Sequence, residues 1–127
     1  SYILTSIPGS SVVFDRGLVT YSNQAKIDLL GVKENLLKMY GAVSGEVAKE
    51  MVLGLFNNSN ATIAIAISGV AGPGSISIEK PEGLVWLAYG IKGENICTLK
   101  LELGAIGRDK VRQKSSVAAL NALISLL

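Results

Sequence analysis

The sequence contains no histidine and a single cysteine, Cys97, among its 127 residues. The absence of histidine excludes Ser-His-Asp and Cys-His catalysis, and it excludes zinc held by histidine ligands. One cysteine excludes a disulfide framework and a cysteine-rich zinc site, and it fits the reducing cytoplasm, where we expect the protein to reside. Any hydrolytic chemistry therefore needs lysine, tyrosine, a carboxylate or bound water as its proton carrier.

Charged residues are scarce as well, at 17% of the chain, with 12 basic and 10 acidic residues. The basic residues are scattered, so we expect no nucleic-acid partner. The longest apolar stretch, residues 61–70, is too short to span a bilayer, and we expect no membrane partner. The chain has the length of one domain, and its apolar content of 49% predicts a homo-oligomer in which another subunit covers part of the apolar surface.

Helix-like and strand-like segments alternate in the first half of the chain, and a hairpin follows. We predict helices at residues 1–6, 23–30, 32–40, 45–56 and 107–127, and strands at residues 12–21 (one strand or two short ones), 61–68, 83–91 and 95–103. Ser22 and Ser44 are expected N-caps, and the apolar run at 61–68 predicts a strand covered on both sides. The order of these elements predicts an α/β fold, a three-layer helix–sheet–helix sandwich with a mixed sheet.

The first candidate site is the segment Ser68-Gly69-Val70-Ala71-Gly72-Pro73-Gly74, directly after the most apolar strand. Glycines at the carboxyl end of a strand let the backbone approach a phosphate or an amide closely. The segment matches neither a Walker A loop nor a dinucleotide fingerprint. It is therefore either a ligand-binding loop or a long glycine turn.

The second candidate is the pair Arg108 and Arg112, four residues apart at the start of the last helix. Two cations there oppose the helix dipole unless an anion lies between them, which predicts a phosphate site. The alternative is a solvated pair beside Asp109.

The third candidate is the segment around Tyr21, Ser22 and Lys26, which places the serine and the lysine on one face of a helix. A desolvated lysine can lose its proton near neutral pH and act as a base, and this is the best general-base candidate in the chain. The alternative is an ordinary surface lysine. Cys97 is expected in the core, and Glu79 and Lys80 either close over a site or form a loop surface.

Together these residues resemble the CinA C-terminal domain family, in order and over nearly the whole chain. The resemblance is carried by Pro8-Gly9-Ser10-Ser11, Val19-Thr20-Tyr21-Ser22-Asn23, Ala25-Lys26, Leu30-Gly31-Val32, Gly41-Ala42-Val43-Ser44, Ser68-Gly69-Val70-Ala71-Gly72-Pro73, Lys80-Pro81 and Arg108-Asp109. It implies a nicotinamide-mononucleotide deamidase that hydrolyses the carboxamide and releases ammonia, with a pyridine nucleotide as its small-molecule partner and no metal or cofactor. It also implies that Lys26 is the base and that Tyr21 orients it or shares its proton. The substrate-binding residues that we expect are Ser10, Ser11, Ser22, Asn23, Ser68, Gly69, Ala71, Gly72, Arg108 and Arg112.

The sequence departs from the family pattern at several points. The resemblance implies a serine nucleophile in a Glu-Ser-Cys-Thr-Gly-Gly motif, which residues 1–127 do not contain; we expect it upstream of Ser1, in a single domain that lacks its N-terminal strand here. Ile106-Gly107 stands where the family usually has Gly-Asp, Glu82 stands in place of a valine, and residues 74–78 lack the usual Asp-Gly-Gly. A non-catalytic nucleotide-binding or regulatory module and a purely structural oligomerisation domain are the alternative hypotheses.

Overall fold

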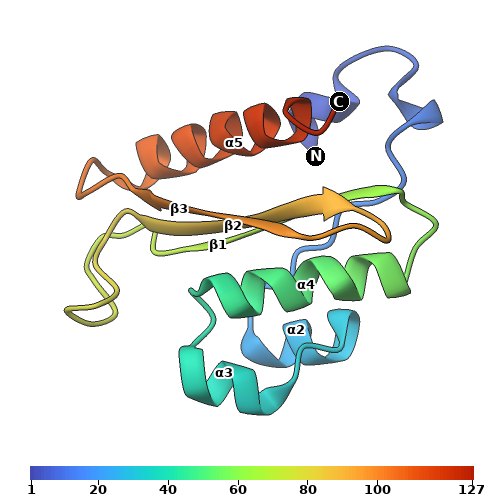
Figure 1. Cartoon of the computed structure of the whole chain (residues 1–127). Helices are drawn as coiled ribbons and strands as arrows, with labels where there is room; N and C mark the ends of the chain where they lie inside the picture. Colours follow the sequence, from blue (N-terminus) through green and yellow to red (C-terminus); the bar gives the residue numbers. More distant parts are fainter.

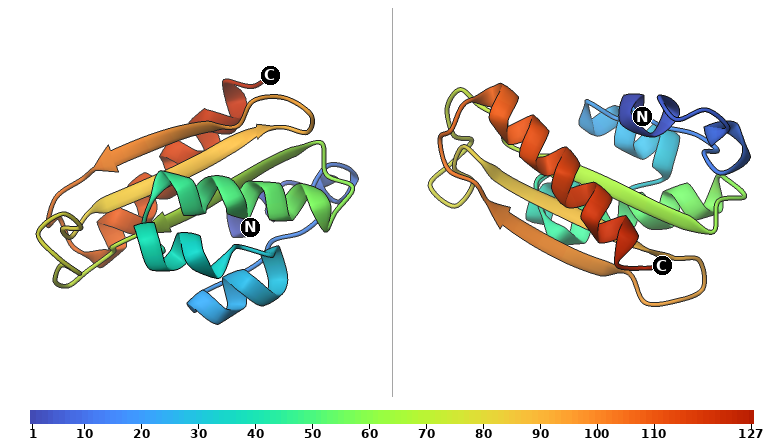
Figure 2. Two further views of the ribbon diagram at one scale, coloured as in Figure 1. Left: turned by 60° about the horizontal axis from the view of Figure 1, so that its bottom comes forward. Right: turned by 90° about the horizontal axis from the view of Figure 1, so that it is seen from above.

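The computed structural model describes all residues from 1 to 127. A three-stranded sheet lies between helix α5 on one face and helix α4 on the other, and helices α2 and α3 pack on the outer side of α4 (Figure 1). The two views in Figure 2 show α4 and α5 lying across opposite faces of the sheet. None of the helices combines the length and the apolar character needed to cross a membrane.

Most elements are joined by short connections; the longer ones are the segment between η1 and α2 and the loop between the first two strands. They are α1 (Tyr2–Thr5), the 3-10 helix η1 (Ser10–Val12), α2 (Asn23–Leu30), α3 (Glu34–Tyr40), α4 (Gly45–Asn57), β1 (Ile63–Gly69), β2 (Leu84–Ile91), β3 (Cys97–Glu102) and α5 (Arg108–Ile124).

The α/β class and the helix–sheet–helix layering are confirmed, but the sheet is antiparallel throughout and not mixed. Strand β1 pairs with β2 from Ile63 opposite Ile91 to Gly69 opposite Val85, and β2 pairs with β3 as a hairpin. A mixed sheet needs a parallel neighbour, and the strand that was expected to supply more pairing, at residues 12–21, does not form.

Residues 13–21 instead run without regular secondary structure, and η1 precedes them. Their β-branched and aromatic composition is typical of strands, but strand preference is realised only where a neighbouring strand supplies hydrogen-bond partners. No strand lies beside them, and Val12, Val19 and Tyr21 are more than four-fifths exposed.

Two predictions of burial, for Cys97 and for strand β1, are also wrong, because β1 and β3 form the two edges of the sheet. Cys97 was expected in the core, but it is exposed on β3. Strand β1 is not covered on both sides along its length, since Ile67 is 42% exposed. Only the central strand β2, with Leu87 and Ala88 fully buried, has the burial expected of a sandwiched strand.

The two predicted N-caps are confirmed, whereas the helix predicted to begin at residue 32 begins at Glu34. The Ser22 hydroxyl accepts the Ala25 N–H and caps α2, while the Ser44 hydroxyl accepts the Val47 N–H and caps α4. Each cap satisfies one of the backbone donors that a helix start leaves free.

Helix α4 is the centre of the larger core, and its Val47, Ala48 and Val52 are fully buried. Helix α2 approaches α4 so closely at Gly54 that a β-carbon there would lie 2.0 Å from the Leu30 carbonyl oxygen. A side chain at this position would separate the two helices, so glycine fixes the placement of α2 on α4.

Candidate functional site

The Lys26 side chain lies in the interior, on the inner face of α2, with only 5% of the residue exposed. Its Nζ donates a hydrogen bond of 2.7 Å to the Thr20 carbonyl oxygen, and Thr20 is itself buried. No carboxylate pairs with the amine. A buried lysine amine with a neutral acceptor as its partner is an unusual arrangement, because lysines are almost never fully buried without a counter-ion.

Burial lowers the pKa of the Lys26 amine from its ordinary value of 10.5. The physical cause is desolvation, which disfavours the charged form of an amine. A lysine of this kind has a larger neutral fraction near pH 7 than a solvated one, and the neutral form can accept a proton.

The other residues expected at the start of α2 lie at the surface. Tyr21 is 83% exposed and makes no side-chain hydrogen bond, and Asn23 is exposed in the first turn of the helix. Ser22 is occupied as the N-cap. Tyr21, Ser22 and Asn23 are therefore close to Lys26 in sequence, but none of their side chains is hydrogen-bonded to the Lys26 amine.

The glycine segment after β1 forms the long loop that leads to β2. Gly72 has a φ of +86°, which favours glycine, and a β-carbon there would lie 2.3 Å from the Glu82 carboxylate. Glu82 Oε2 accepts the Gly74 N–H at 2.8 Å, so the residue that departs from the family pattern closes the loop. Ala71 is half-buried against the core between the sheet and α5.

Two side chains tie this loop to the elements around it. Ser68 Oγ donates a hydrogen bond of 2.7 Å to the Ala42 carbonyl in the connection between α3 and α4. Lys80 Nζ donates to the Tyr40 carbonyl at the end of α3. These two bonds hold the loop against the end of α3 and the α3–α4 connection.

The arginine pair lies on the first turns of α5, beside the same loop. Arg108 Nη1 donates a hydrogen bond of 2.9 Å to the Gly72 carbonyl, which brings two separately predicted candidates together. Arg112 lies one turn further along, exposed and outside every ion pair of the structure. The N-cap of α5, Gly107, provides no side-chain hydrogen bond, so the backbone donors of this helix start have no capping partner.

The predicted site residues therefore fall into separate groups. Figure 1 shows the glycine loop and the start of α5 at one end of the sheet, and η1 with Ser10 and Ser11 at the other end. Ser10 lines an apolar cleft of about 460 Å³ between the N-terminal segment, the start of β1 and the end of α5. No hydrogen bond joins Lys26 to either group.

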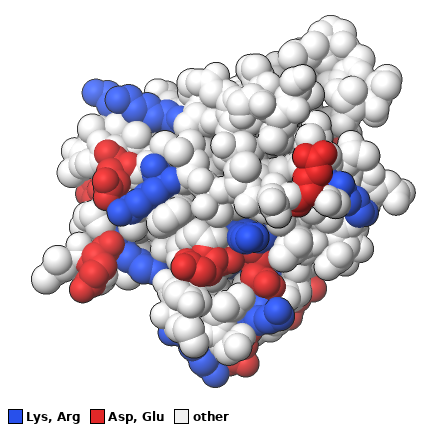
Figure 3. All heavy atoms as spheres, viewed as in Figure 1, with Lys and Arg blue, Asp and Glu red and all other residues white.

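Basic and acidic side chains are interspersed on the face of the molecule seen in Figure 3, and the region around the N-terminal segment carries no charged side chain in that view. No group of three or more aspartate, glutamate and cysteine residues is arranged to hold a metal ion.

A family model described as the CinA C-terminal domain matches residues 1–127. The chain belongs to the CinA C-terminal domain family. Among solved structures, the competence/damage inducible protein CihA from Agrobacterium tumefaciens superimposes on this CinA C-terminal domain with a TM-score of 0.93 and 46% identity. The match covers 97% of this chain and 74% of that one.

Two curated relatives of this CinA C-terminal domain differ in their own length. The nicotinamide-nucleotide amidohydrolase PncC of Enterobacter agglomerans is 45% identical over 121 residues, which cover 95% of this chain and 73% of that protein. A CinA-like protein of Akkermansia muciniphila is 46% identical over 121 residues, which cover 95% of this chain but 29% of that protein. The CinA C-terminal domain therefore occurs both as most of a short protein and as a minor part of a long one.

Sequence reasoning missed two groups in this CinA C-terminal domain. The Thr20 carbonyl, which holds the Lys26 amine, is a backbone atom that every residue type offers, so no sequence signal could have found it. Glu82 was noted as a departure, but its bond to Gly74 depends on a loop conformation that no local pattern predicts.

Proposed function

We propose that this chain forms the catalytic part of a nicotinamide-nucleotide amidohydrolase, which converts nicotinamide mononucleotide and water to nicotinate mononucleotide and ammonia. The observation that carries the proposal is the buried Lys26 amine, held by the Thr20 carbonyl in a chain without histidine. The relative named nicotinamide-nucleotide amidohydrolase, 45% identical over 95% of this chain, supports the same reaction.

Lys26 acts as the proton carrier in this reaction. The neutral amine accepts the proton of an attacking hydroxyl as the oxygen bonds to the carboxamide carbon. The resulting ammonium then donates that proton to the amide nitrogen as the carbon–nitrogen bond breaks and ammonia leaves. A water molecule completes the hydrolysis of the acyl intermediate. The resemblance implies that the hydroxyl belongs to the serine of the Glu-Ser-Cys-Thr-Gly-Gly motif.

The Thr20 carbonyl has a defined part in the cycle. It accepts one N–H of the amine, so the lone pair of the neutral form is directed away from that bond. The same acceptor stabilises the ammonium after proton uptake, because a hydrogen bond to the charged form favours it.

The start of α5 and the glycine loop would hold the phosphate of the nucleotide. Arg108 uses one N–H for the Gly72 carbonyl, and a guanidinium has further donors for an anion. Arg112 lies one turn away on the same helix with no ion-pair partner, and the uncapped N–H groups at the helix start favour negative charge. Phosphate binding thus accounts for two cations placed against the helix dipole.

The test uses the complete native protein with Lys26→Met, Lys26→Arg and, as a matched control, the exposed Lys49→Met. Ammonia release from nicotinamide mononucleotide is measured together with the nucleotide Kd by calorimetry. We expect kcat to fall about 10²- to 10⁴-fold in both Lys26 variants, with little change in Kd, because one general base contributes about that much. The control should retain its activity.

Two results would contradict the proposal in different ways. Full activity of Lys26→Met would remove the lysine from the mechanism. Binding of the nucleotide without ammonia release by the unsubstituted protein would instead favour the non-catalytic binding module.

A further inference from the structure

The Glu82 side chain folds back onto the glycine loop from the far end of the β1–β2 connection. Its Oε2 accepts the Gly74 N–H at 2.8 Å. A β-carbon on Gly72 would lie 2.3 Å from the carboxylate carbon of Glu82, so this side chain packs directly on the main chain of Gly72. Glu82 is half-buried there, whereas residues 75–79 are exposed. One carboxylate therefore contacts two glycines of the loop directly.

A second hydrogen bond joins the same two ends of the connection. The Glu82 N–H donates to Ser75 Oγ at 2.9 Å, while the Glu82 carboxylate holds Gly74. We call this pair of hydrogen bonds the Glu82 clasp. The two departures from the family pattern, Glu82 and residues 74–78, thus meet in the structure. Valine, which the family usually has in place of Glu82, offers no acceptor for the Gly74 N–H.

The glycines of the loop make such a clasp consequential. Gly72 and Gly74 have φ values of +86° and +89°, and glycine adopts either sign of φ at little cost. A hydrogen bond from a backbone N–H to a carboxylate is stronger than one to a neutral acceptor. The Glu82 clasp therefore selects one conformation in a segment that has many available to it.

Arg108 binds the residue on which the Glu82 carboxylate packs. Its Nη1 donates a hydrogen bond of 2.9 Å to the Gly72 carbonyl. No ion pair joins Glu82 to Arg108, so the carboxylate reaches the arginine through Gly72 and leaves the guanidinium charge uncompensated by Glu82. The direction of the Gly72 carbonyl depends on the backbone conformation of Gly72, which the contact with Glu82 restricts.

We propose that Glu82 is a positioning residue for Arg108, because its clasp fixes the Gly72 carbonyl that orients the guanidinium for the phosphate of the substrate. The inference rests on the proposed function, in which Arg108 binds that phosphate. Glu82 itself contacts no phosphate, since two anions repel each other. Its effect on the ligand is a gain in preorganisation of the binding site.

The test measures the Kd of nicotinamide mononucleotide, and of nicotinamide riboside as its counterpart without phosphate, by calorimetry on the complete native protein. Glu82→Val removes the acceptor of the clasp, and Glu82→Gln keeps an oxygen for the Gly74 N–H. Glu79→Val is the matched control, because it removes an exposed carboxylate of the same loop that makes no hydrogen bond or ion pair. We expect Glu82→Val to weaken mononucleotide binding about tenfold and Glu82→Gln by less than about threefold. The Kd of the riboside, and both Kd values in Glu79→Val, should stay unchanged.

A double-mutant cycle separates positioning of Arg108 from a general effect on the fold. In an Arg108→Ala background, Glu82→Val should change the mononucleotide Kd by less than about twofold, because the Gly72 carbonyl then has no guanidinium to orient. A merely structural role of Glu82 would weaken binding by the same factor in both backgrounds.

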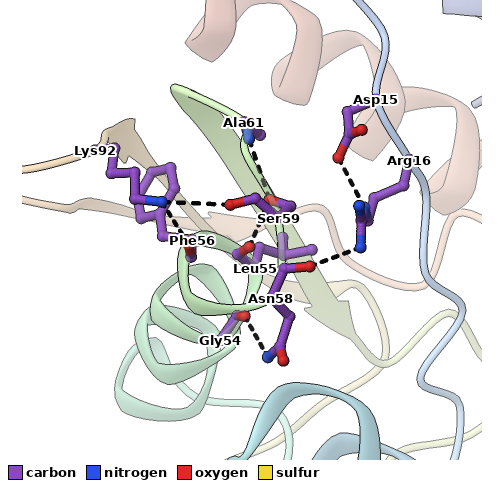
Figure 4. Close-up of polar contacts among 9 residues, drawn as sticks. All are labelled: Asp15, Arg16, Gly54, Leu55, Phe56, Asn58, Ser59, Ala61 and Lys92. Atoms are coloured by element: carbon purple, nitrogen blue, oxygen red, sulfur yellow. Dashed lines mark hydrogen bonds and ion pairs between the residues drawn. The ribbon is translucent and has the colours of Figure 1, made fainter.

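A lysine at the other end of β2 provides the control for loss of stability. Lys92 Nζ donates to the Phe56 carbonyl at 2.8 Å and to the Ser59 carbonyl at 3.3 Å, and it thereby holds the chain that follows α4 (Figure 4). Lys92 follows the last residue of β2, and the eight residues of that strand separate it from the glycine loop. Lys92→Met should therefore lower Tm and leave the mononucleotide Kd unchanged.

The outcomes separate this inference from the proposed function. An unchanged mononucleotide Kd in folded Glu82→Val, or an equal loss in both Arg108 backgrounds, would overturn the positioning role even if the protein releases ammonia. A loss that depends on Arg108, without any ammonia release, would keep the positioning role and reject the amidohydrolase. No binding of the mononucleotide by the unsubstituted protein would overturn both. Ser75→Ala, which removes the other bond of the clasp, should weaken binding in the same direction and serves if Glu82→Val does not fold.

Discussion

Replacing Lys26 by methionine should make the stability of the protein less dependent on pH. Lys26 is 5% exposed, and its amine donates one hydrogen bond of 2.7 Å to the Thr20 carbonyl and has no carboxylate partner. Burial lowers its pKa from 10.5, so the folded state releases this proton more readily than the unfolded chain does. Methionine has a similar volume and no charge, so Lys26→Met removes the titration and keeps the packing.

The sign of the effect follows from proton counting. Below the lowered pKa both states hold the proton, and the free energy of unfolding contributed by this group is independent of pH. Between the lowered pKa and 10.5 the unfolded chain binds more protons, so the stability of the unsubstituted protein rises with pH. The rise is about 1.4 kcal/mol per pH unit within that window.

The stability of Lys26→Met lacks this rise with pH. The variant also loses stability through a second effect that does not depend on pH. The Thr20 carbonyl loses its donor, which destabilises the variant by about 1–3 kcal/mol where no water replaces the bond. Relief from burying a cation acts in the opposite direction at low pH. The difference in stability between the two proteins should therefore shift in favour of the unsubstituted protein as pH increases.

Urea unfolding followed by far-ultraviolet circular dichroism, at pH values from about 6 to about 10, measures this difference, because the window lies below the ordinary lysine pKa. Lys49→Met, which removes an exposed lysine from α4, gives the baseline for loss of a solvated amine. If the difference between Lys26→Met and the unsubstituted protein is the same at every pH, the folded state does not desolvate the amine and the reasoning is refuted.

Two further substitutions test the placement of α2. Gly54→Ala should destabilise the protein by about 1–3 kcal/mol in urea unfolding, because the new β-carbon meets the Leu30 carbonyl. This cost outweighs the gain in helix propensity of about 1 kcal/mol. Unchanged stability would show that the two helices separate without cost. Ser22→Ala should lower the free energy of unfolding by about 1 kcal/mol through loss of the N-cap, whereas Ser22→Gly should lower it by only about a few tenths of that. A raised KM for the nucleotide in Ser22→Gly, without loss of Tm, would show that this hydroxyl also binds substrate.

Features that depend on neighbouring residues in the chain could be predicted from the sequence. The caps at Ser22 and Ser44 need only an N–H three residues further on, and the hairpin needs only two strand-like runs around Lys92-Gly93-Glu94. These elements form where expected because their partners are local.

Features that depend on distant partners could not be predicted in the same way. The segment at 12–21 has a strand-like composition but no adjacent strand, and Cys97 is exposed because β3 lies at an edge of the sheet. The hydrogen bond from Arg108 to Gly72 joins residues 36 positions apart, so the sequence indicated both candidates and not their contact.

The single tryptophan of the chain makes the glycine loop accessible to spectroscopy without any label. Trp86 lies opposite Ser68 across the β1–β2 pair and packs with Val70 at the base of the loop. Its ring also lies against Gly45 at the start of α4, where a β-carbon would come within 3.0 Å of it. The tryptophan emission of the protein, excited selectively over its four tyrosines, therefore comes from one indole placed between the loop and the helix, and a ligand that moves either one changes that emission.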